Sequence, residues 1–591
     1  MTGSKASRLA ALCAAGLLLA GAAAAQTDGQ ATAPPRDLTG DAAPPPPEPQ
    51  GPSGITVSQL GSYEGPAAGL LDDSNGGMGP AIWSTTPRAD AIGLIDDMPS
   101  TVVPSLHDLE RRVLETRADA PSGASDRSFQ AARLRKLLAL GYVNDAGILA
   151  DNTQVPDSPG FDRVRADAVL FAGHVNDACS PLTQTRLSSA EPFWIELRAY
   201  CYAVQGDDAA LQLTKAVMQQ QGLDDDAFAT LLDDVQSGQK ADPGEIDAPN
   251  ALDAYLMGQA GVPIPLAMAV KLGAPGEMLV VQDSARAPED RLAAAEQVLQ
   301  TGILTADTLR ALASAAKFSD NQVQDAENAA IALPFLSGQA LLRQAALQAA
   351  DNDRKARLIA AALTLGARKN LFPVAAAMQA DIAAQIVPDP GIKDLGAVFV
   401  PALLLAHEPA AMRAWGAMTG KNLIASEVLL ADVNLLAPDP AEQKDVSDAL
   451  DDIAGEIGAD KPDGGEEGRE TAALILSLYD ALGQPLSDDA KVAMQTFAAR
   501  AWPGRSFTPA QMGRIEDAAA NPGRKAEAIM ALIGAVGANG PGDLSPDTIA
   551  KLVRVLVRLG EAKAARDFAV EALALYKPAP PPPPAPPAPQ P

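Results

Sequence analysis

Apolar positions recur every three or four residues through most of the chain from about residue 105 onward. Ser105 opens the first such segment and Asp108 follows three residues later, which predicts a helix that begins with Ser105 as its N-cap. The apolar side chains of this segment share one face of the expected helix: Leu106, Leu109, Val113 and Leu114.

Further segments of about 12 to 20 residues repeat this pattern and are separated by short Gly, Pro or Asp runs. The apolar residues are mostly Ala, Leu and Val, and aromatic residues make up only 4% of the chain. Abundant Ala and Leu favour closely packed helices, whereas sheets are richer in Thr, Tyr, Ile and Phe in alternation. The sequence therefore predicts an all-α fold of stacked helical hairpins, an α-solenoid.

The remaining stretches divide the chain into regions of different character. Residues 54–104 mix turn residues with apolar anchors such as Trp83 and Ile92, which predicts an irregular arm packed on the helical body. Residues 238–250 are a possible further joint. The predicted organisation is a signal peptide at 1–25, a Pro/Gly-rich disordered linker at 26–53, the arm at 54–104, a helical-repeat body at 105–436, an acidic joint at 437–468, C-terminal hairpins at 469–576 and a polyproline tail at 577–591.

The first 25 residues have the three parts of a secretory signal. Lys5 and Arg8 precede an apolar run, and small residues then allow cleavage after Ala25. Cys13 lies inside the apolar run after Leu12, so a lipid-attachment site is not expected. No other segment has the 18 or more uninterrupted apolar residues that span a bilayer. We therefore expect a periplasmic or secreted protein without a transmembrane segment in its mature chain.

The formal net charge of −28 bears on possible partners. A chain this acidic repels phosphate backbones, so nucleic acid is not an expected partner. The charge has two interpretations: like-charge repulsion that keeps the protein in solution, or a docking surface for a cationic partner or divalent ions. Composition alone leaves both open.

Three stretches, around residues 130–150, 192–217 and 547–578, share a pattern of apolar, glycine and small positions. In the last of them, apolar residues on a first helix precede a glycine turn, and small residues follow on a second helix: Leu552, Leu556, Gly560, Ala565, Ala569, Ala572, with Pro578 beyond. The two earlier stretches match in part: Leu137, Gly141, Ala146 and Ala150 in one, and Ala199, Tyr202, Gly206 and Asp207 in the other, where Leu211 replaces the preferred Ala. This pattern resembles tetratricopeptide repeats. The resemblance implies stacked hairpins that bind proteins or peptides on a concave face.

The sequence matches no complete catalytic motif. Ser314–Lys317 matches the Ser-x-x-Lys pattern of penicillin-recognising enzymes, but Ser319 of a Ser-Asp-Asn triplet follows too closely to face it across a cleft. The Glu-Ser and Gly-Leu-Met-Gln motifs of soluble lytic transglycosylases do not occur. Residues 72–77 resemble a calcium loop without its closing Glu, which favours a turn. We predict no catalytic residue and no cofactor.

The histidines and cysteines give no metal-site spacing. His107, His174 and His407 are far apart, and only His174 has a cysteine nearby, Cys179, five residues on. Cys179 and Cys201 are read first as a structural disulfide between neighbouring helices, worth about 3 kcal/mol. The alternative is a redox-active or metal-binding pair, although the spacing matches no CxxC motif.

Four aromatic residues gather in residues 192–207, around Cys201. On a helix, the apolar residues of this segment form one broad face, a predicted packing seam made of Phe193, Trp194, Leu197, Tyr200 and Val204. Gly206 and Asp207 are expected to end the helix.

These observations favour an exported, non-enzymatic helical-repeat scaffold that binds protein or cell-envelope partners. The alternative is a peptidoglycan-binding or glycan-acting envelope protein whose carboxylates converge only in the fold, because general acid/base chemistry on glycans needs a pair of carboxylates in a cleft. A third possibility is a spacer whose Pro-rich ends span the wall.

Overall fold

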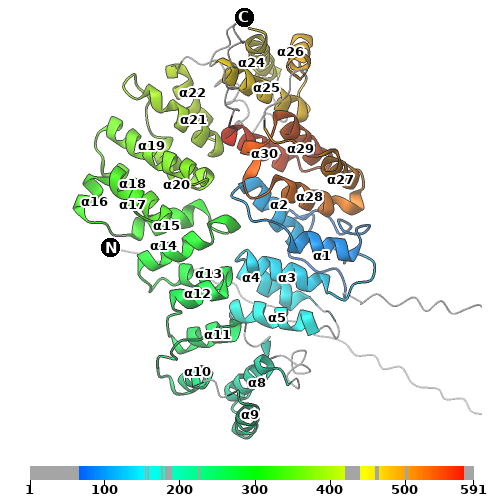
Figure 1. Ribbon diagram of the computed structural model, residues 1–591, viewed down its shortest axis with the longest axis vertical. Coiled ribbons are helices and arrows are strands. Elements are labelled where there is room, and N and C mark those ends of the chain that lie inside the picture. Colours follow the sequence, from blue (N-terminus) through cyan, green and yellow to red (C-terminus); the bar gives the residue numbers. More distant parts are fainter. Residues whose placement is uncertain are drawn as a thin grey trace, which may run out of the picture. The chain divides into compact units, whose positions relative to one another are not determined.

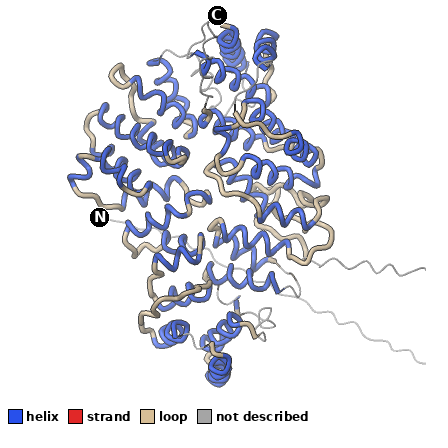
Figure 2. The backbone as a smooth tube through the Cα atoms, viewed as in Figure 1, coloured by secondary structure: helices blue, strands red, loops and turns tan. Residues whose placement is uncertain are grey.

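Helices account for the regular secondary structure in the part of the chain that the structure describes (Figure 2). The computed structural model describes residues 65–577 except 154, 156–158, 175–177, 180–189, 224–225, 420–439, 460–464 and 499–503. Within these ranges lie 27 α-helices, four short 3-10 helices and three isolated β-bridges. The fold class predicted from the sequence is therefore confirmed as all-α.

The helices up to residue 237 are α1 (Arg88–Asp96), α2 (Pro104–Glu115), α3 (Phe129–Ala139), α4 (Val143–Asn152), α5 (Pro159–Phe171), α8 (Pro192–Gln205), α9 (Asp208–Gln221) and α10 (Asp226–Ser237). The next group is α11 (Ala251–Ala260), α12 (Leu266–Leu272), α13 (Ala274–Gln282), α14 (Pro288–Gln297), α15 (Ala306–Ala315), α16 (Asp320–Gln324), α17 (Ala326–Ala332), α18 (Phe335–Gln348), α19 (Asn352–Arg368), α20 (Phe372–Ala383), α21 (Gly396–Leu405) and α22 (Pro409–Thr419). The last group is α24 (Pro440–Gly458), α25 (Gly465–Ala481), α26 (Asp488–Ala498), α27 (Pro509–Ala519), α28 (Lys525–Val536), α29 (Pro546–Arg558) and α30 (Ala562–Leu575).

Most helices pack against the next helix along the chain, for example α4 on α5, α8 on α9, α18 on α19 and α29 on α30 (Figure 1). The turn between α8 and α9 shows how the sequence sets such a pair. Gly206 ends α8 in the left-handed region at φ 71°, and Asp207 then accepts a hydrogen bond from the Ala210 N–H at the start of α9. Sequential hairpins follow from these local stop and start signals.

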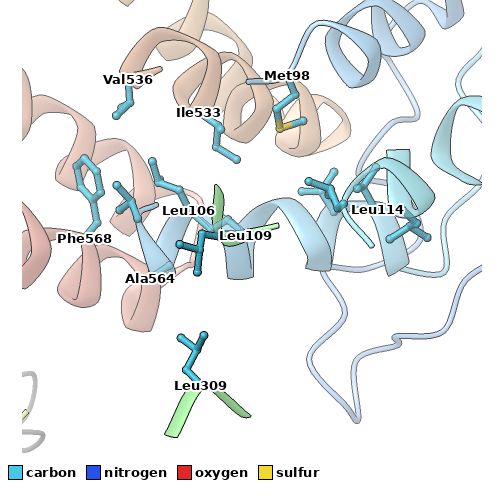
Figure 3. Packing of buried hydrophobic residues seen from close by; sticks show 14 of the residues in the cluster. Met98, Leu106, Leu109, Leu114, Leu309, Ile533, Val536, Ala564 and Phe568 are labelled. Carbon is cyan, nitrogen blue, oxygen red and sulfur yellow. The ribbon is translucent and has the colours of Figure 1, made fainter. Parts of the chain in front are cut away.

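Helices from the two ends of the described chain also pack together. Helix α2 contacts α28 and α30, α1 contacts α28, and α21 contacts α30 (Figure 1). Figure 3 shows Leu106 and Leu109 of α2 beside Phe568 of α30 and Ile533 of α28, all of them buried. The core around α2 therefore joins residues more than 400 positions apart.

Polar groups reinforce this contact between first and last helices. The carboxylate of Glu571 in α30 accepts hydrogen bonds from the Ser105 N–H, at 2.8 Å, and from the Ser105 hydroxyl. Glu561 binds Arg112 of α2 at 2.7 Å and Lys525 of α28 at 2.6 Å. The prediction of Ser105 as an N-cap is wrong, because α2 begins at Pro104 after Val103. Proline suits the first turn, and a carboxylate from α30 satisfies the free N–H of Ser105.

The arm predicted at 54–104 is described from Gly65 onward and is more regular than expected. It contains α1, which packs against both α3 and α28. Ile82, Trp83, Ile92 and Ile95 are buried, with Trp83 only 1% exposed. A helix covered on two sides does not show a single apolar stripe, which explains why the sequence pattern did not reveal α1.

The acidic stretch 437–468 contains helix α24, which packs against α25 and α26. Leu450, Ile453 and Ile457 are buried, whereas Asp451 and Asp452 are exposed. The acidic residues thus occupy the outer face of an amphipathic helix. The other possible joint, 238–250, is a non-helical connection between α10 and α11.

Ala25, the linker 26–53 and residues 578–591 of the polyproline tail lie outside the described residues. Among the helices that are described, none is long and apolar enough to cross a membrane.

Candidate functional site

The aromatic segment of α8 lies in the interior. Phe193, Trp194, Leu197 and Tyr200 are each at most 5% exposed. Tyr200 meets Tyr255 of α11 edge-on with ring centroids 5.7 Å apart, and the Arg163 guanidinium of α5 lies over the Phe193 ring at 3.6 Å. These contacts come from two other helices, so this face joins α5, α8 and α11.

Val204, the fifth residue of the predicted seam, is 51% exposed, so its assignment is wrong. It lies on the correct face of α8 but one turn beyond Tyr200, in the last turn before Gly206. The contacts from α5 and α11 meet the earlier turns of the helix. Helical periodicity fixes the direction of a side chain but not how far a neighbouring helix extends.

Cys179 and Cys201 form a disulfide, the pairing expected from the sequence. Cys201 is buried in α8, and the bond ties this helix to the segment after α5. Both sulfurs are used, so neither is a thiol ligand or a nucleophile in this state.

His107 and His174 lie in different environments, and His407 follows α21 in the left-handed region at φ 54°. His107 is 8% exposed on α2, and burial lowers its pKa to about 4. The backbone carbonyl of Thr101 acts in the opposite direction and raises the pKa. Its ring lies against Gly302, where an added Cβ would come 2.3 Å from the His107 Cγ. His174 pairs with Asp151 at 3.0 Å. No group of three or more His, Cys, Asp or Glu side chains suitable for a metal ion occurs among the described residues.

The two rejected motifs have structural roles. The Ser314 hydroxyl donates to the carbonyl of Arg310 one turn earlier, and Ser319 caps the start of α16. Asp72 accepts hydrogen bonds from the backbone N–H and the hydroxyl of Ser74, which makes residues 72–77 a turn.

Several buried carboxyl groups have raised pKa values. Burial raises the pKa of Glu110 and Glu277 to about 7 and that of Glu115 and Glu571 to about 8. Lys136, 3.6 Å from Glu110, opposes the shift of that residue. None of the four lines either of the two cavities described below. Raised carboxyl pKa values often mark active sites, but these groups belong to the packed interior around α2, α13 and α30.

A cavity of about 710 Å³ lies between α5, the start of α8 and the connection from α10 to α11. Five carboxylates line it: Glu191, Glu196, Glu245, Asp247 and Asp253. Arg163 is the cation among its lining residues, and its charge is shared with Asp167 at 3.1 Å. We call this cavity the acidic cleft; its volume is typical of ligand sites, and its charge favours cations.

Some of these carboxylates also have local roles. Asp253 accepts a hydrogen bond from the Asn250 N–H in the capping box of α11. Glu245 lies 3.6 Å from Lys271 and is 82% exposed at its side chain. Glu191 is the N-cap residue of α8. Carboxylates at helix N-termini offset the helix dipole, which accounts for part of the acidic character of the cleft.

A second cavity of about 430 Å³ lies between α1 on one side and α27 and α28 on the other. Its lining is mostly apolar or small: Ala89, Gly93, Leu94, Met98, Ile515, Met530, Ala531, Gly534 and Ala535. A Cβ at Gly93 or Gly534 would meet no neighbouring atom within 4 Å, so both glycines face open space. We call this cavity the small-residue groove.

The sequence did not reveal either cavity, because the residues that line each one are far apart in the chain. The acidic cleft combines Arg163, residues 191–196 and residues 245–253, and the groove combines residues 89–98 with 511–535. Each cavity has one weak signal in the sequence. The acidic residues of 238–250 indicate the acidic cleft, and glycines inside helical patterns, such as Gly93 and Gly534, indicate the groove.

Comparison of this chain with protein-family models, with curated proteins and with solved structures found no match. The two cavities and the arrangement of the helices are therefore the features on which a function is proposed.

Proposed function

We propose that this protein is a non-enzymatic helical-repeat scaffold that binds a basic segment of a partner protein in the acidic cleft. The observation that carries the proposal is the lining of the cleft, five carboxylates and one shared arginine around about 710 Å³. A lysine-rich or arginine-rich peptide would place its cations near these carboxylates, and opposite charges also speed association.

The scaffold class is supported by the last hairpin, which resembles a tetratricopeptide unit. Leu552 and Leu556 of α29 and Ala565, Ala569 and Ala572 of α30 are all fully buried. Gly560, between the two helices, has φ 78°, which suits the turn. These are the positions at which such repeats use apolar and small residues, and we propose a solenoid of stacked hairpins on that basis.

We also propose that the protein acts in an oxidising compartment, the periplasm or the cell exterior. The Cys179–Cys201 disulfide supports this location, because disulfides persist outside the reducing cytosol. The secretory signal expected at residues 1–25 agrees with it. Nucleic acid is not a proposed partner, because the chain carries a net charge of −28.

Charge neutralisation in the cleft tests the binding proposal. The triple variant Glu191→Gln, Glu196→Gln and Asp247→Asn is titrated with a fluorescent lysine-rich decapeptide at low salt and compared with the unmodified protein. We expect the variant to bind about tenfold more weakly, since a loss of ~1.4 kcal/mol is a factor of ten. Binding to the unmodified protein should also weaken as salt rises.

A matched control changes the net charge equally at another place. Asp448→Asn, Asp451→Asn and Asp452→Asn remove three exposed carboxylates from α24. We expect less than a twofold effect from this control. Equal effects of the two triple variants would show that total charge, not the cleft, attracts the peptide, and would overturn the proposal.

A second candidate is an envelope protein that binds or acts on peptidoglycan. The same convergence of carboxylates in a cleft favours it, because glycan chemistry needs two carboxylates that flank the scissile bond. Incubation with purified peptidoglycan, followed by release of soluble fragments, tests this function. If the unmodified protein releases soluble fragments and the cleft triple variant does not, the glycan-acting function would be favoured over the scaffold.

A further inference from the structure

We propose that the uncharged segment 578–591 binds in cis in the small-residue groove between α1, α27 and α28. This proposal is independent of the acidic cleft and of the partner proposed for it. It depends on the apolar and small residues that line the groove, on the place where the described chain ends, and on the chemistry of the fourteen residues that follow.

The chemistry of the segment matches the groove. Residues 578–591 are ten prolines, three alanines and one glutamine, without any charged side chain. The floor of the groove includes Leu94, Met98, Ile515 and Met530, and the glycines at 93 and 534 leave it open. Polyproline chains are stiff before binding, so they lose little conformational entropy when an apolar surface takes them up.

Four polar residues also line the groove, Asp90 and Asp97 on the α1 side and Gln511 and Arg514 on α27, and the two on α27 suit the same occupant. Proline has no N–H, so most of the segment can only accept hydrogen bonds through its carbonyl oxygens. The rim residues on α27 that can donate are Gln511 and Arg514. Arg514 is 54% exposed at its side chain and lies 4.0 Å from Glu527, which leaves most of its five N–H donors available.

The position of Lys577 brings the segment close to the groove. The Lys577 N–H donates to the carbonyl of Gly542 at 3.2 Å. Gly542 follows Ala535, a groove residue, by seven positions, which limits their separation to about 25 Å. Gly540 also contacts Val103, which follows the groove residue Met98 by five positions.

The length of the segment is sufficient. Fourteen residues in a polyproline II conformation extend about 43 Å at ~3.1 Å per residue. The groove follows α1 from Ala89 to Met98, which is about 15 Å at ~1.5 Å per residue. The segment can therefore cover the distance from Gly542 and still lie along the whole groove. Because it is tethered, its effective concentration at the groove is of millimolar order, so even a weak contact is populated.

The test uses a fluorescent peptide of residues 577–591 added to the full chain and to a variant that lacks 578–591. Fluorescence anisotropy should show saturable binding to the truncated protein and at least about tenfold weaker binding to the full chain, because the tethered segment competes. Equal binding to the two proteins, or no binding to either, would overturn the proposal.

Groove filling identifies the site. Gly534→Leu in the truncated protein fills the groove and should abolish peptide binding, and leucine favours a helix more than glycine does, so α28 should stay folded. Gly455→Leu is the matched control, because Gly455 lies inside α24 with no neighbouring atom near its Cβ position. This control should bind the peptide unchanged. Peptide binding that survives Gly534→Leu would place the contact elsewhere and overturn the proposal.

Two other occupants have distinct outcomes, and each would contradict the proposal. A second copy of the chain would appear as a concentration-dependent mass in light scattering that Gly534→Leu removes and truncation leaves unchanged. If the linker 26–53 is the occupant, a fluorescent peptide of residues 26–53 should bind the truncated protein more tightly than the 577–591 peptide does, and Gly534→Leu should abolish that binding.

Discussion

Helices α8 and α2 each carry a buried face, but the residues that cover the two faces come from very different distances along the chain. The face of α8 is held by a disulfide between residues 22 positions apart and by Tyr255, 55 positions from Tyr200. Helix α2 is held by Glu571 and Glu561, which lie 466 and 449 positions from Ser105 and Arg112.

The chemistry of the two regions differs as well. Helix α8 is held by the disulfide, by the Tyr200–Tyr255 pair and by the Arg163 guanidinium over Phe193, and none of its own buried residues is an ionised group. The surroundings of α2 include the buried Glu110, Glu115, His107 and Arg133. Buried charges are costly unless they are bonded, so the region around α2 depends on polar geometry as well as on apolar packing. We expect damage to α8 to stay local and damage around α2 to loosen both ends of the described chain.

The largest effect is expected from Arg133→Met. The Arg133 side chain on α3 is 1% exposed and donates five hydrogen bonds, to the carbonyls of Leu114, Thr116 and Ala68 and to the Gln130 side chain. Met cannot donate, so these buried carbonyls lose their partners. We expect a loss of about 3–5 kcal/mol in the free energy of unfolding, measured by urea denaturation.

Arg135→Met is the control for this variant. Arg135 is 42% exposed at its side chain and lies 3.9 Å from Asp96, so its loss should cost less than about 0.5 kcal/mol. Hydrogen exchange should also show that Arg133→Met loosens α2 together with α28 and α30. Loosening confined to α3 would contradict the proposed coupling of the first and last helices.

Removal of the disulfide should have the next largest effect. Cys179→Ala with Cys201→Ala releases the loop between residues 22 positions apart, which should cost about 3 kcal/mol in a denaturant titration. Hydrogen exchange should rise in α8 and α9 and stay unchanged in α2. Equal exchange in α2 and α8 would mean that the two regions unfold as one unit, against the contrast drawn above.

The smallest effect is expected from Glu110→Gln and depends on pH. Burial raises the pKa of Glu110 from its usual 4.5 to about 7. Between these values the unfolded chain releases the proton and the folded chain keeps it, so stability is lost as the pH rises from 4.5 through 7. Gln cannot titrate, so the variant should lose less stability than the unmodified protein does as the pH rises from 4 to 8, which urea denaturation at several pH values measures.

Asp108→Asn provides the comparison on the same helix, because Asp108 is 53% exposed at its side chain. This change should alter the free energy of unfolding at pH 7 by less than about 0.5 kcal/mol, because an exposed ion pair contributes little. If Glu110→Gln has the same slope as the unmodified protein, then the carboxyl group of Glu110 does not resist ionisation in the folded state.

The sequence predicted the parts of the fold that depend on local signals. Periodic apolar residues predicted successive helices from about residue 105 onward, and the all-α class followed from them. The Cys179–Cys201 pairing and four residues of the α8 seam were also foreseen, because they lie within one or two helices of each other. Three features were not foreseen: helix α1, the exposure of Val204 and the capping of α2. Each depends on which helices from other parts of the sequence pack beside it.

The candidate sites could not be predicted, for the same reason. The acidic cleft needs Glu196 and Asp247 on one cavity wall, and the small-residue groove needs Gly93 opposite Gly534. Residues this far apart leave no spacing that a single sequence can reveal.

The sequence by itself determined that this chain forms helices, that it is strongly acidic, and that Cys179 and Cys201 can pair. Hydrophobic periodicity and helix stop signals act over a few residues, so they can be read directly. Only the tertiary structure decided that α30 caps α2 through Glu571, that Arg133 binds the end of α2, and that the acidic cleft and the small-residue groove form. Those contacts depend on how helices hundreds of residues apart pack together, and packing is a property of whole surfaces, not of any local pattern.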